Sequence, residues 1–213
     1  MKYYPVFLDI KDKKCVVVGG GEVAARKAER LLDCGAEVFV ISPKLSPELA
    51  ALKEENIICH IAAEYKGDLI DEAALVIGAT NDEKTNAQIS LDAHSKGIPV
   101  NIVDDPKRCD FILPSLMQRG DLAIAVGTGG KSPALARHLR EELESIYGEE
   151  YEILLNILGN LRAKMVKNEG MGKDWFESML AAGILDSIKN KDIKKVKEIV
   201  QKITGEEVEI EFN

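Results

Sequence analysis

The stretch that decides the fold is Cys15-Val16-Val17-Val18-Gly19-Gly20-Gly21-Glu22-Val23-Ala24. Its first half is β-branched, which is typical of a buried strand, and the residues after the glycines repeat at helical spacing. The glycines therefore form a turn between a strand and a helix, in the pattern G-x-G-x-x-A. In this pattern Gly19 permits the tight turn, Gly21 lets the backbone approach a ligand, and Ala24 lets the helix pack closely on the sheet.

This loop predicts a site for the pyrophosphate of a nicotinamide dinucleotide. The first N–H groups of a helix have no partner within the helix, and the helix dipole adds positive potential there. A purely structural turn is the alternative, but the position after the first strand of a β-α-β unit favours binding. The residues that we predict to hold the cofactor here are Gly19, Gly20, Gly21, Glu22 and Val23.

Two further segments are candidates for cofactor binding. The second strand ends in Ser42-Pro43-Lys44, without the acidic residue that commonly binds the ribose hydroxyls, so the choice between NAD and NADP stays open. Ser42 fits a ribose, and Lys44 fits either a 2′-phosphate or a solvated loop. Thr80 and Asn81 follow the fourth strand at the ligand-binding edge of such sheets, although Asn81 or Asp82 equally fits a helix cap.

The pattern along the chain indicates an α/β fold that begins with a doubly wound, Rossmann-like parallel sheet. We expect helices between β-branched runs at 15–18, 37–41, 57–61, 75–78 and 99–103, with Gly35 ending the first helix. The apolar runs 111–116 and 122–126 then flank a hairpin-like segment, Gln118-Arg119-Gly120-Asp121. Beyond it the sequence predicts only helices, with a loop at 168–172; they span 132–147, where Ser132 is the N-cap, 149–167, 173–188 and 191–203.

Composition narrows the class of protein. The 213 residues are 46% hydrophobic and 30% charged, which is ordinary for a globular chain. The net charge of −8 argues against nucleic acid as the partner, and no apolar run or leader-like segment predicts a membrane or secreted protein, so we expect a cytoplasmic one. The four cysteines are widely spaced, and three lie in or beside apolar runs as small buried residues do; this disfavours a disulfide or metal framework.

Five segments, in order, resemble the precorrin-2 dehydrogenase and sirohydrochlorin ferrochelatase family, which includes the N-terminal half of siroheme synthase. They cover most of residues 1 to 150, whereas the helices after Gly148 carry no motif. The segments are Tyr4–Leu8, Val18–Lys27, Val100–Pro106, Phe111–Ser115 and Gly129–Arg137.

The resemblance implies NAD-dependent oxidation of precorrin-2 to sirohydrochlorin and, in some members, insertion of ferrous iron. It also implies a homodimer joined through a small α+β segment, giving a dinucleotide-binding domain at 1–113, a dimerisation segment at 114–148 and a helical C-terminal domain at 149–213. By the same resemblance Asp104 is similar to the family's catalytic aspartate. Its place after the fifth strand, beside the cofactor crevice, agrees with proton transfer, although a turn aspartate is the alternative; Asp105, before a proline, fits the turn better.

The second glycine-rich segment fits an anion site. Thr128, Gly129, Gly130, Lys131 and Ser132 resemble a phosphate loop, but Ala125 replaces its first glycine, so a nucleotide triphosphatase is disfavoured. We predict instead that these residues, with Arg137 one helical turn further on, bind the carboxylates of a tetrapyrrole substrate. Arg137 fits a solvated or dimer-interface position nearly as well.

No metal site is predicted, because His60, His94 and His138 lack ligand spacing, and any iron would be a transient co-substrate. The lysine-rich segment 189–202 keeps an apolar face formed by Ile193, Val196, Ile199 and Val200, which favours a solvated helix over a binding patch. A non-catalytic dinucleotide sensor is the main rival to the dehydrogenase. It has no evident need for Asp104 together with a second glycine-rich loop.

Overall fold

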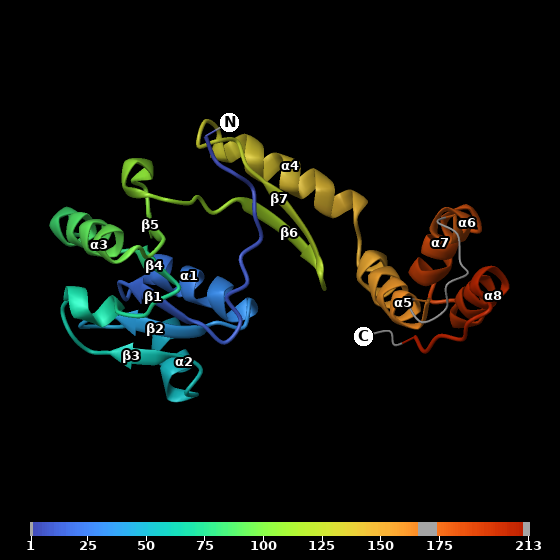
Figure 1. Cartoon of the computed structure of the whole chain (residues 1–213), viewed down its shortest axis with the longest axis horizontal. Helices are drawn as coiled ribbons and strands as arrows, with labels where there is room; N and C mark the ends of the chain where they lie inside the picture. The colour runs from blue at the N-terminus through green and yellow to red at the C-terminus, as the bar shows by residue number, and fades with distance from the viewer. Residues whose placement is uncertain (1, 166–173, 211–213) are drawn as a thin grey trace. The chain divides into compact units, whose positions relative to one another are not determined.

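The computed structural model describes residues 2–165 and 174–210, which divide into two compact units, Met1–Leu113 and Pro114–Asn213. The first unit contains a parallel sheet in the order β3-β2-β1-β4-β5 (Figure 1). The strands are β1 (Lys14–Val18), β2 (Glu37–Ile41), β3 (Cys59–Ile61), β4 (Leu75–Gly78) and β5 (Val100–Ile102). The predicted Rossmann-like sheet is therefore confirmed, and the strand order reverses at β1, where the glycine loop begins.

Helices cover both faces of this sheet because its strands alternate their side chains between two cores. Cys15 and Val17 of β1 face the core that packs α1 (Glu22–Asp33) and α2 (Pro47–Glu54). Val16 and Val18 face the opposite core, which packs α3 (Glu83–Lys96) and the 3₁₀ turn η1 (Gly67–Ile70). Since both faces are covered, the strands are almost continuously apolar, as parallel sheets require.

The second unit begins with a hairpin and one long helix. β6 (Ser115–Arg119) pairs antiparallel with β7 (Leu122–Val126), and α4 (Pro133–Ile146) follows. The predicted cap of α4 is confirmed, because the Ser132 hydroxyl accepts a hydrogen bond from the Leu135 N–H at 3.2 Å. The chain reaches this hairpin from the first unit through a second short 3₁₀ turn, η2 (Pro106–Arg108).

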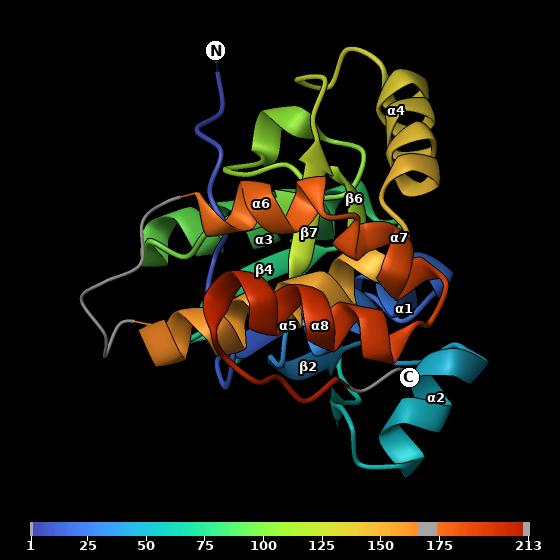
Figure 2. The same cartoon turned by 90° about the vertical axis from the view of Figure 1, so that its right-hand side faces the viewer.

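Four helices form the remainder of the described chain, and Figure 2 shows them together. They are α5 (Glu150–Met165), α6 (Trp175–Ala181), α7 (Ile184–Lys189) and α8 (Ile193–Thr204), and they share one apolar core. Val196, Ile199 and Val200 of α8 are buried in it, while the predicted fourth member of that face, Ile193, is 43% exposed. Among the described residues, no helix is long and apolar enough to cross a lipid bilayer.

Three predicted elements differ from the structure for local reasons. The third strand starts at Cys59 rather than Ile57, because the Ile57 N–H caps α2 by donating to the Leu52 carbonyl at 2.9 Å. The hairpin turn is shorter than predicted, since Gln118 and Arg119 pair with Ala123 and Leu122 across the ladder. The run predicted to begin at Phe111 becomes a strand only at Ser115.

The helix predicted over 173–188 is wrong, because the chain forms α6 and α7 with a break at Gly183. Gly183 has φ +79°, a left-handed conformation that ends one helix and starts the next. Position 173, the loop predicted at 168–172 and the predicted end of the preceding helix at 167 lie outside the described residues. The expectation of three buried cysteines is also wrong: Cys15 alone is buried, Cys109 is half-buried, and Cys34 and Cys59 are exposed.

We predict opposite effects of the same substitution at two glycines of the second unit. Gly183→Ala should lower the free energy of unfolding by about 1 kcal/mol, because alanine resists a left-handed backbone. Gly159→Ala should raise it by about 1 kcal/mol, since Gly159 lies within α5 and a Cβ there meets nothing within 4 Å. Urea denaturation of the two variants tests this, and a loss of stability in both would contradict the assignment of Gly159 to a freely accessible helix face.

Candidate functional site

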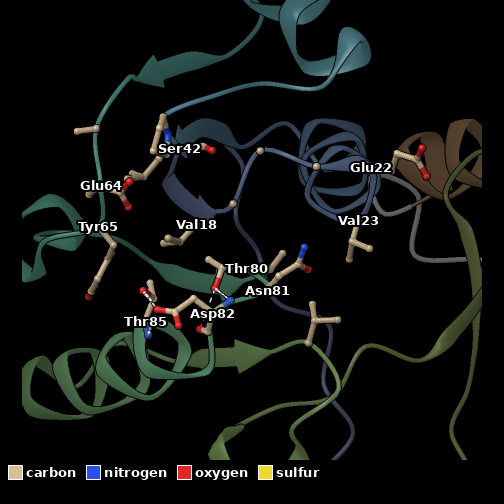
Figure 3. A pocket seen from close by; sticks show the side chains of 18 of the residues that line it. Val18, Glu22, Val23, Ser42, Glu64, Tyr65, Thr80, Asn81, Asp82 and Thr85 are labelled. Carbon is tan, nitrogen blue, oxygen red and sulfur yellow. Dashed lines mark hydrogen bonds between the residues drawn. The ribbon is translucent and has the colours of Figure 1, made fainter.

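A cleft of about 610 Å³ opens where the parallel strands end, and it collects most of the residues predicted for the cofactor (Figure 3). Nine of the ten predicted cofactor residues line it, and Asp104 lines it as well. The nine are Gly19, Gly20, Gly21, Glu22, Val23, Ser42, Pro43, Thr80 and Asn81. The tenth, Lys44, is exposed and does not line the cleft.

The three glycines of the loop have different physical reasons to be glycine. A Cβ on Gly19, where φ is +130°, would lie 2.4 Å from the Ala79 carbonyl oxygen, and a Cβ on Gly20 would lie 1.9 Å from that of Lys44. The protein's own backbone therefore excludes side chains at both positions. Gly21 is different: it has an extended backbone with φ −90° and ψ −176°, and a Cβ there would meet nothing within 4 Å. The space in front of Gly21 is thus open for a ligand.

The N-terminus of α1 supplies unpaired donors to this space. Gly21 is the N-cap residue of α1 and offers no side-chain cap, whereas α2, α3, α4 and α8 are capped by side chains. The first N–H groups of α1 therefore keep their hydrogen-bonding capacity, and the helix dipole adds positive potential at the same point. Both features favour an anion such as a pyrophosphate.

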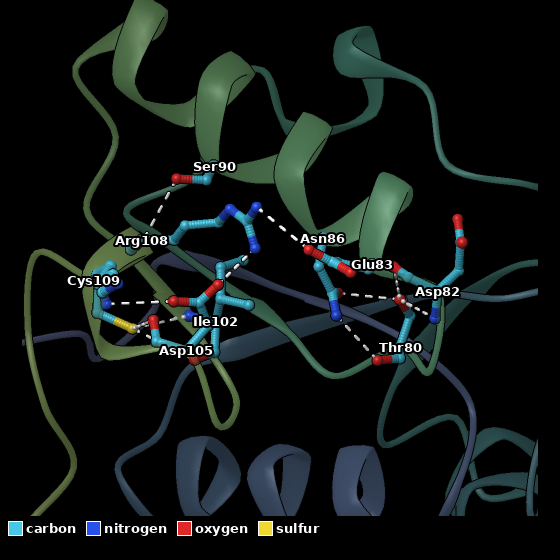
Figure 4. Close-up of polar contacts among 10 residues, drawn as sticks. Thr80, Asp82, Glu83, Asn86, Ser90, Ile102, Asp105, Arg108 and Cys109 are labelled. Carbon is cyan, nitrogen blue, oxygen red and sulfur yellow. Dashed lines mark hydrogen bonds and ion pairs between the residues drawn. The ribbon is translucent and has the colours of Figure 1, made fainter.

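A network of side chains fixes the loop after β4 (Figure 4). The Thr80 hydroxyl donates to Asn86 Oδ1 at 2.9 Å, and Asn86 Nδ2 donates back to the Thr80 carbonyl at 2.9 Å. Asp82 accepts from the Thr85 N–H at 2.9 Å, so Asp82 is the cap of α3. Hydrogen bonds from the Thr85 hydroxyl and N–H lower the pKa of Asp82, which keeps its carboxylate ionised. Asn81 is left free of this network and faces the cleft.

Asp104 has an unusual backbone for a residue that is not glycine. Its φ is +62°, and it occupies a tight turn in which the Asp105 N–H donates to the Ile102 carbonyl at 3.2 Å. Aspartate and asparagine tolerate the left-handed region better than most residues, but the conformation still costs about 1 kcal/mol. Such strain persists only where the surroundings hold it, and it is frequent at functional sites.

The surroundings of Asp104 do hold it in place. As predicted, Asp105 serves the turn: its carboxylate accepts from the Lys107 N–H at 3.2 Å and pairs with Arg108 (Figure 4). The Cys109 sulfur lies 3.2 Å from the Ile102 nitrogen and 3.1 Å from the Asp105 carbonyl oxygen, which ties the turn to the end of β5. Burial raises the pKa of the Cys109 thiol, so it serves as a neutral hydrogen-bonding group here.

A half-buried cation acts on Asp104 from α1. Burial lowers the pKa of Lys27, and Arg26 lowers it further, whereas the negative charge of Asp104 raises it. The electrostatic interaction between Lys27 and Asp104 is thus felt across the end of the sheet. Asp104 also lines a second, smaller hollow of about 220 Å³ with Asn81, Glu83 and Arg108, so space for a further ligand group adjoins the cleft at this residue.

The residues predicted to bind substrate carboxylates form a separate loop in the second unit. Thr128 and Ser132 close it, because the Thr128 hydroxyl donates to the Ser132 carbonyl at 3.0 Å and the Ser132 N–H lies 3.2 Å from that hydroxyl. Gly129 and Gly130 both have positive φ, and Lys131 is exposed. Arg137 pairs with Glu141 at 2.8 Å along α4. Within the two described stretches, no three side chains of His, Cys, Asp or Glu gather as a metal site.

Sequence reasoning missed the residues that follow β3. Ala63, Glu64 and Tyr65 line the cleft, and the Tyr65 hydroxyl donates to Asp92 at 3.0 Å. Burial and this hydrogen bond raise the pKa of Tyr65. The signal was available, because a residue that follows a parallel strand lies at the same sheet edge as the glycine loop.

Comparison with known proteins agrees with this geometry. A family model for NAD(P)-binding matches residues 6–115, which are 110 of the 213 residues. The chain belongs to this NAD(P)-binding family. A second model, for the central part of sirohaem biosynthesis proteins, matches residues 119–146 of this NAD(P)-binding chain.

Curated relatives and a solved structure resemble most of the chain. It is 42% identical over 185 residues to a siroheme synthase of Nitrosomonas europaea, covering 84% of this chain and 39% of the relative. It is 40% identical over 200 residues to that of Mannheimia succiniciproducens, covering 92% and 42%. The chain thus spans about two fifths of these relatives. The structure of SirC, a precorrin-2 dehydrogenase, matches with a TM-score of 0.72 at 25% identity, covering 96% of this chain and all of SirC.

We predict that Gly21→Ala separates ligand binding from folding. The added methyl group would project into the space for the pyrophosphate, so the affinity for NAD(H) should fall by about tenfold or more. The free energy of unfolding should change by less than about 1 kcal/mol, because the backbone is extended and no protein atom is contacted. Calorimetric titration and urea denaturation measure the two effects.

The matched control is Gly20→Ala, which should destabilise the fold itself by clashing with the Lys44 carbonyl. If Gly21→Ala bound NAD as tightly as the unaltered chain, the pyrophosphate would have to lie elsewhere.

Proposed function

We propose that this chain oxidises precorrin-2 to sirohydrochlorin with NAD as the hydride acceptor. The observation that carries the proposal is the meeting, in one cleft, of an open glycine turn at Gly21 with a strained carboxylate at Asp104. The resemblance to SirC over nearly the whole chain supports the same reaction, as do the siroheme synthases, of which the chain matches only a part.

In this proposal the chain's own residues position two reactants and accept one proton. When bound, the dinucleotide supplies the acceptor for a hydride. The first N–H groups of α1 bind its pyrophosphate, and Ser42 and Thr80 lie along the same cleft on opposite sides of the loop. The oxidation removes a hydride and a proton from the substrate, so a base is required, and Asp104 is the carboxylate that the cleft offers at the end of β5.

Lys27 supports this role electrostatically. The negative charge of Asp104 raises the pKa of Lys27, so the two side chains attract each other across the end of the sheet. The left-handed turn fixes the direction of the Asp104 Cα–Cβ bond, so the backbone at this residue needs little reorganisation when the substrate binds. The hollow beside Asn81 and Arg108 offers room for a substituent of the substrate next to the reacting atoms.

We also propose that the loop Thr128–Ser132, together with Arg137, binds the carboxylate groups of the substrate. Precorrin-2 carries several acetate and propionate groups, and the exposed Lys131 offers a cationic donor to such anions. We further propose that the protein works in the cytoplasm as a homodimer joined through residues 114–148, with 1–113 binding the dinucleotide and 149–213 forming a helical domain. Ferrous iron would be a second substrate, inserted into sirohydrochlorin.

A sensor that binds the dinucleotide without turnover is the alternative, and anaerobic assay with precorrin-2 and NAD separates the two. We predict that the unaltered chain forms NADH and sirohydrochlorin. Asp104→Asn should lower kcat at least about a hundredfold while NAD affinity and stability are kept, because asparagine fits the same left-handed turn but cannot accept the proton.

Asp105→Asn provides the control. It weakens the pairing with Arg108 and costs some stability, but it should keep most of the turnover, since Asp105 serves the turn. Binding of NAD without any NADH formation by the unaltered chain would favour the sensor, and equal loss in both variants would indicate a structural role for Asp104.

A further inference from the structure

The charged side chains around the dinucleotide cleft all have the same sign. Among the residues that the structure places along it, four are acidic, Glu22, Glu64, Asp82 and Asp104, and none is Lys, Arg or His. At the pyrophosphate this charge is offset by the uncapped N–H groups of α1. Beside Glu64, at the other end of the cleft, no cationic side chain of the described residues lines the wall. The lining of the cleft therefore offers no cationic side chain to an additional phosphate.

The side of the cleft that receives the adenosine follows from the strand order. In this fold the residues after β2 contact the adenosine ribose, and β2 lies between β1 and β3. Asp104, after β5, lies at the opposite end of the sheet. The ribose hydroxyls are thus expected beside Ser42 and the segment that follows β3.

Glu64 brings a carboxylate close to the end of the second strand, where the sequence has no acidic residue. The segments after β2 and β3 are joined by a hydrogen bond from the Ser42 N–H to the Ile61 carbonyl at 3.1 Å and by a contact of 2.8 Å between His60 Nε2 and the Ser42 carbonyl. Figure 3 shows Glu64 beside Ser42, on the side of the cleft away from Glu22. Glu64 is exposed and makes no hydrogen bond or ion pair with other described residues, so its carboxylate is free to accept from a ribose.

The residues nearest to Glu64 do not favour a 2′-phosphate. The Ser42 hydroxyl donates to the Lys44 carbonyl at 2.7 Å, so its hydrogen is already used. Lys44 packs its carbonyl against Gly20 and contributes no lining to the cleft. A 2′-phosphate carries a charge of about −1.5 to −2 at pH 7, and it would approach a carboxylate with no cation in the lining.

We propose that this site selects NAD over NADP and that Glu64, at the end of β3, determines the selection. The Glu64 carboxylate accepts a hydrogen bond from the adenosine ribose hydroxyls and repels a 2′-phosphate. This inference rests on the dinucleotide site proposed above. In this fold the acidic residue usually follows the second strand; here Glu64 follows the third strand, which is hydrogen-bonded to the second.

Calorimetric titration of the full chain with NAD, NADP, ADP-ribose and 2′-phospho-ADP-ribose tests the selection. The last two lack nicotinamide, so the difference between them reports on the 2′-phosphate without any contribution from the nicotinamide. We expect the unaltered chain to bind each compound without a 2′-phosphate at least about tenfold more tightly than its phosphorylated counterpart. Glu64→Gln should reduce this ratio at least about fivefold, through tighter binding of the phosphorylated compounds and weaker binding of the others.

The matched control is Glu54→Gln, which removes an exposed carboxylate from α2 outside the cleft and should leave the ratio unchanged. Equal affinity of the unaltered chain for NAD and NADP would overturn the inference while leaving the dehydrogenase proposal intact. The same holds for an unchanged ratio in Glu64→Gln, or for a selective loss of NADP affinity in Lys44→Gln. Failure of both dinucleotides to bind would overturn the proposed function and this inference together.

Discussion

The rest of the first unit depends on one constraint: the glycine loop packs closely against the segments that follow β2 and β4. The turn after β1 lies against the carbonyls of Ala79 and Lys44, so that no side chain fits at Gly19 or Gly20. This contact sets the ends of β1, β2 and β4 at one level, and the Gly20 carbonyl accepts from the Ser46 N–H at 2.6 Å in the same region. The residues that follow each strand consequently gather along one cleft, although they are far apart in the sequence.

Within that cleft, positive and negative charge come from different parts of the structure. Positive potential comes from backbone N–H groups at the start of α1 and from the half-buried Lys27, while the cleft-lining side chains bring negative charge. Backbone donors are fixed by the helix, so they would hold the pyrophosphate of the proposed cofactor without a cationic side chain in the lining of the cleft. The carboxylates remain available for hydroxyl groups and for proton transfer.

Local sequence patterns were sufficient to predict much of this architecture and to place the glycine loop in the candidate site. The β-branched run at Val16–Val18, the glycine spacing and the Ser132-Pro133 signal depend on neighbouring residues, so they could be interpreted without a structure. The sequence could have placed Glu64 at the ligand-binding edge, because it follows a predicted strand, but its position beside Ser42 depends on the pairing of β2 with β3. The break at Gly183 was missed because a glycine inside an apolar helical pattern does not reveal its own φ. The strained turn at Asp104 is likewise a property of the backbone, visible only once Ile102 and Asp105 are placed.

Because the start of α1 has no side-chain cap, the exposure of its first N–H groups to water depends on whether a ligand fills the cleft. The N–H groups of Glu22 and Val23 have no side-chain cap and open onto the cleft, so water reaches them whenever the cleft holds only solvent. A pyrophosphate seated there would shield these amides while leaving those of capped helices such as α3 as they were. Amide hydrogen exchange at the first turn of this one helix would therefore follow the filling of the site, with no need for a turnover assay or a labelled ligand.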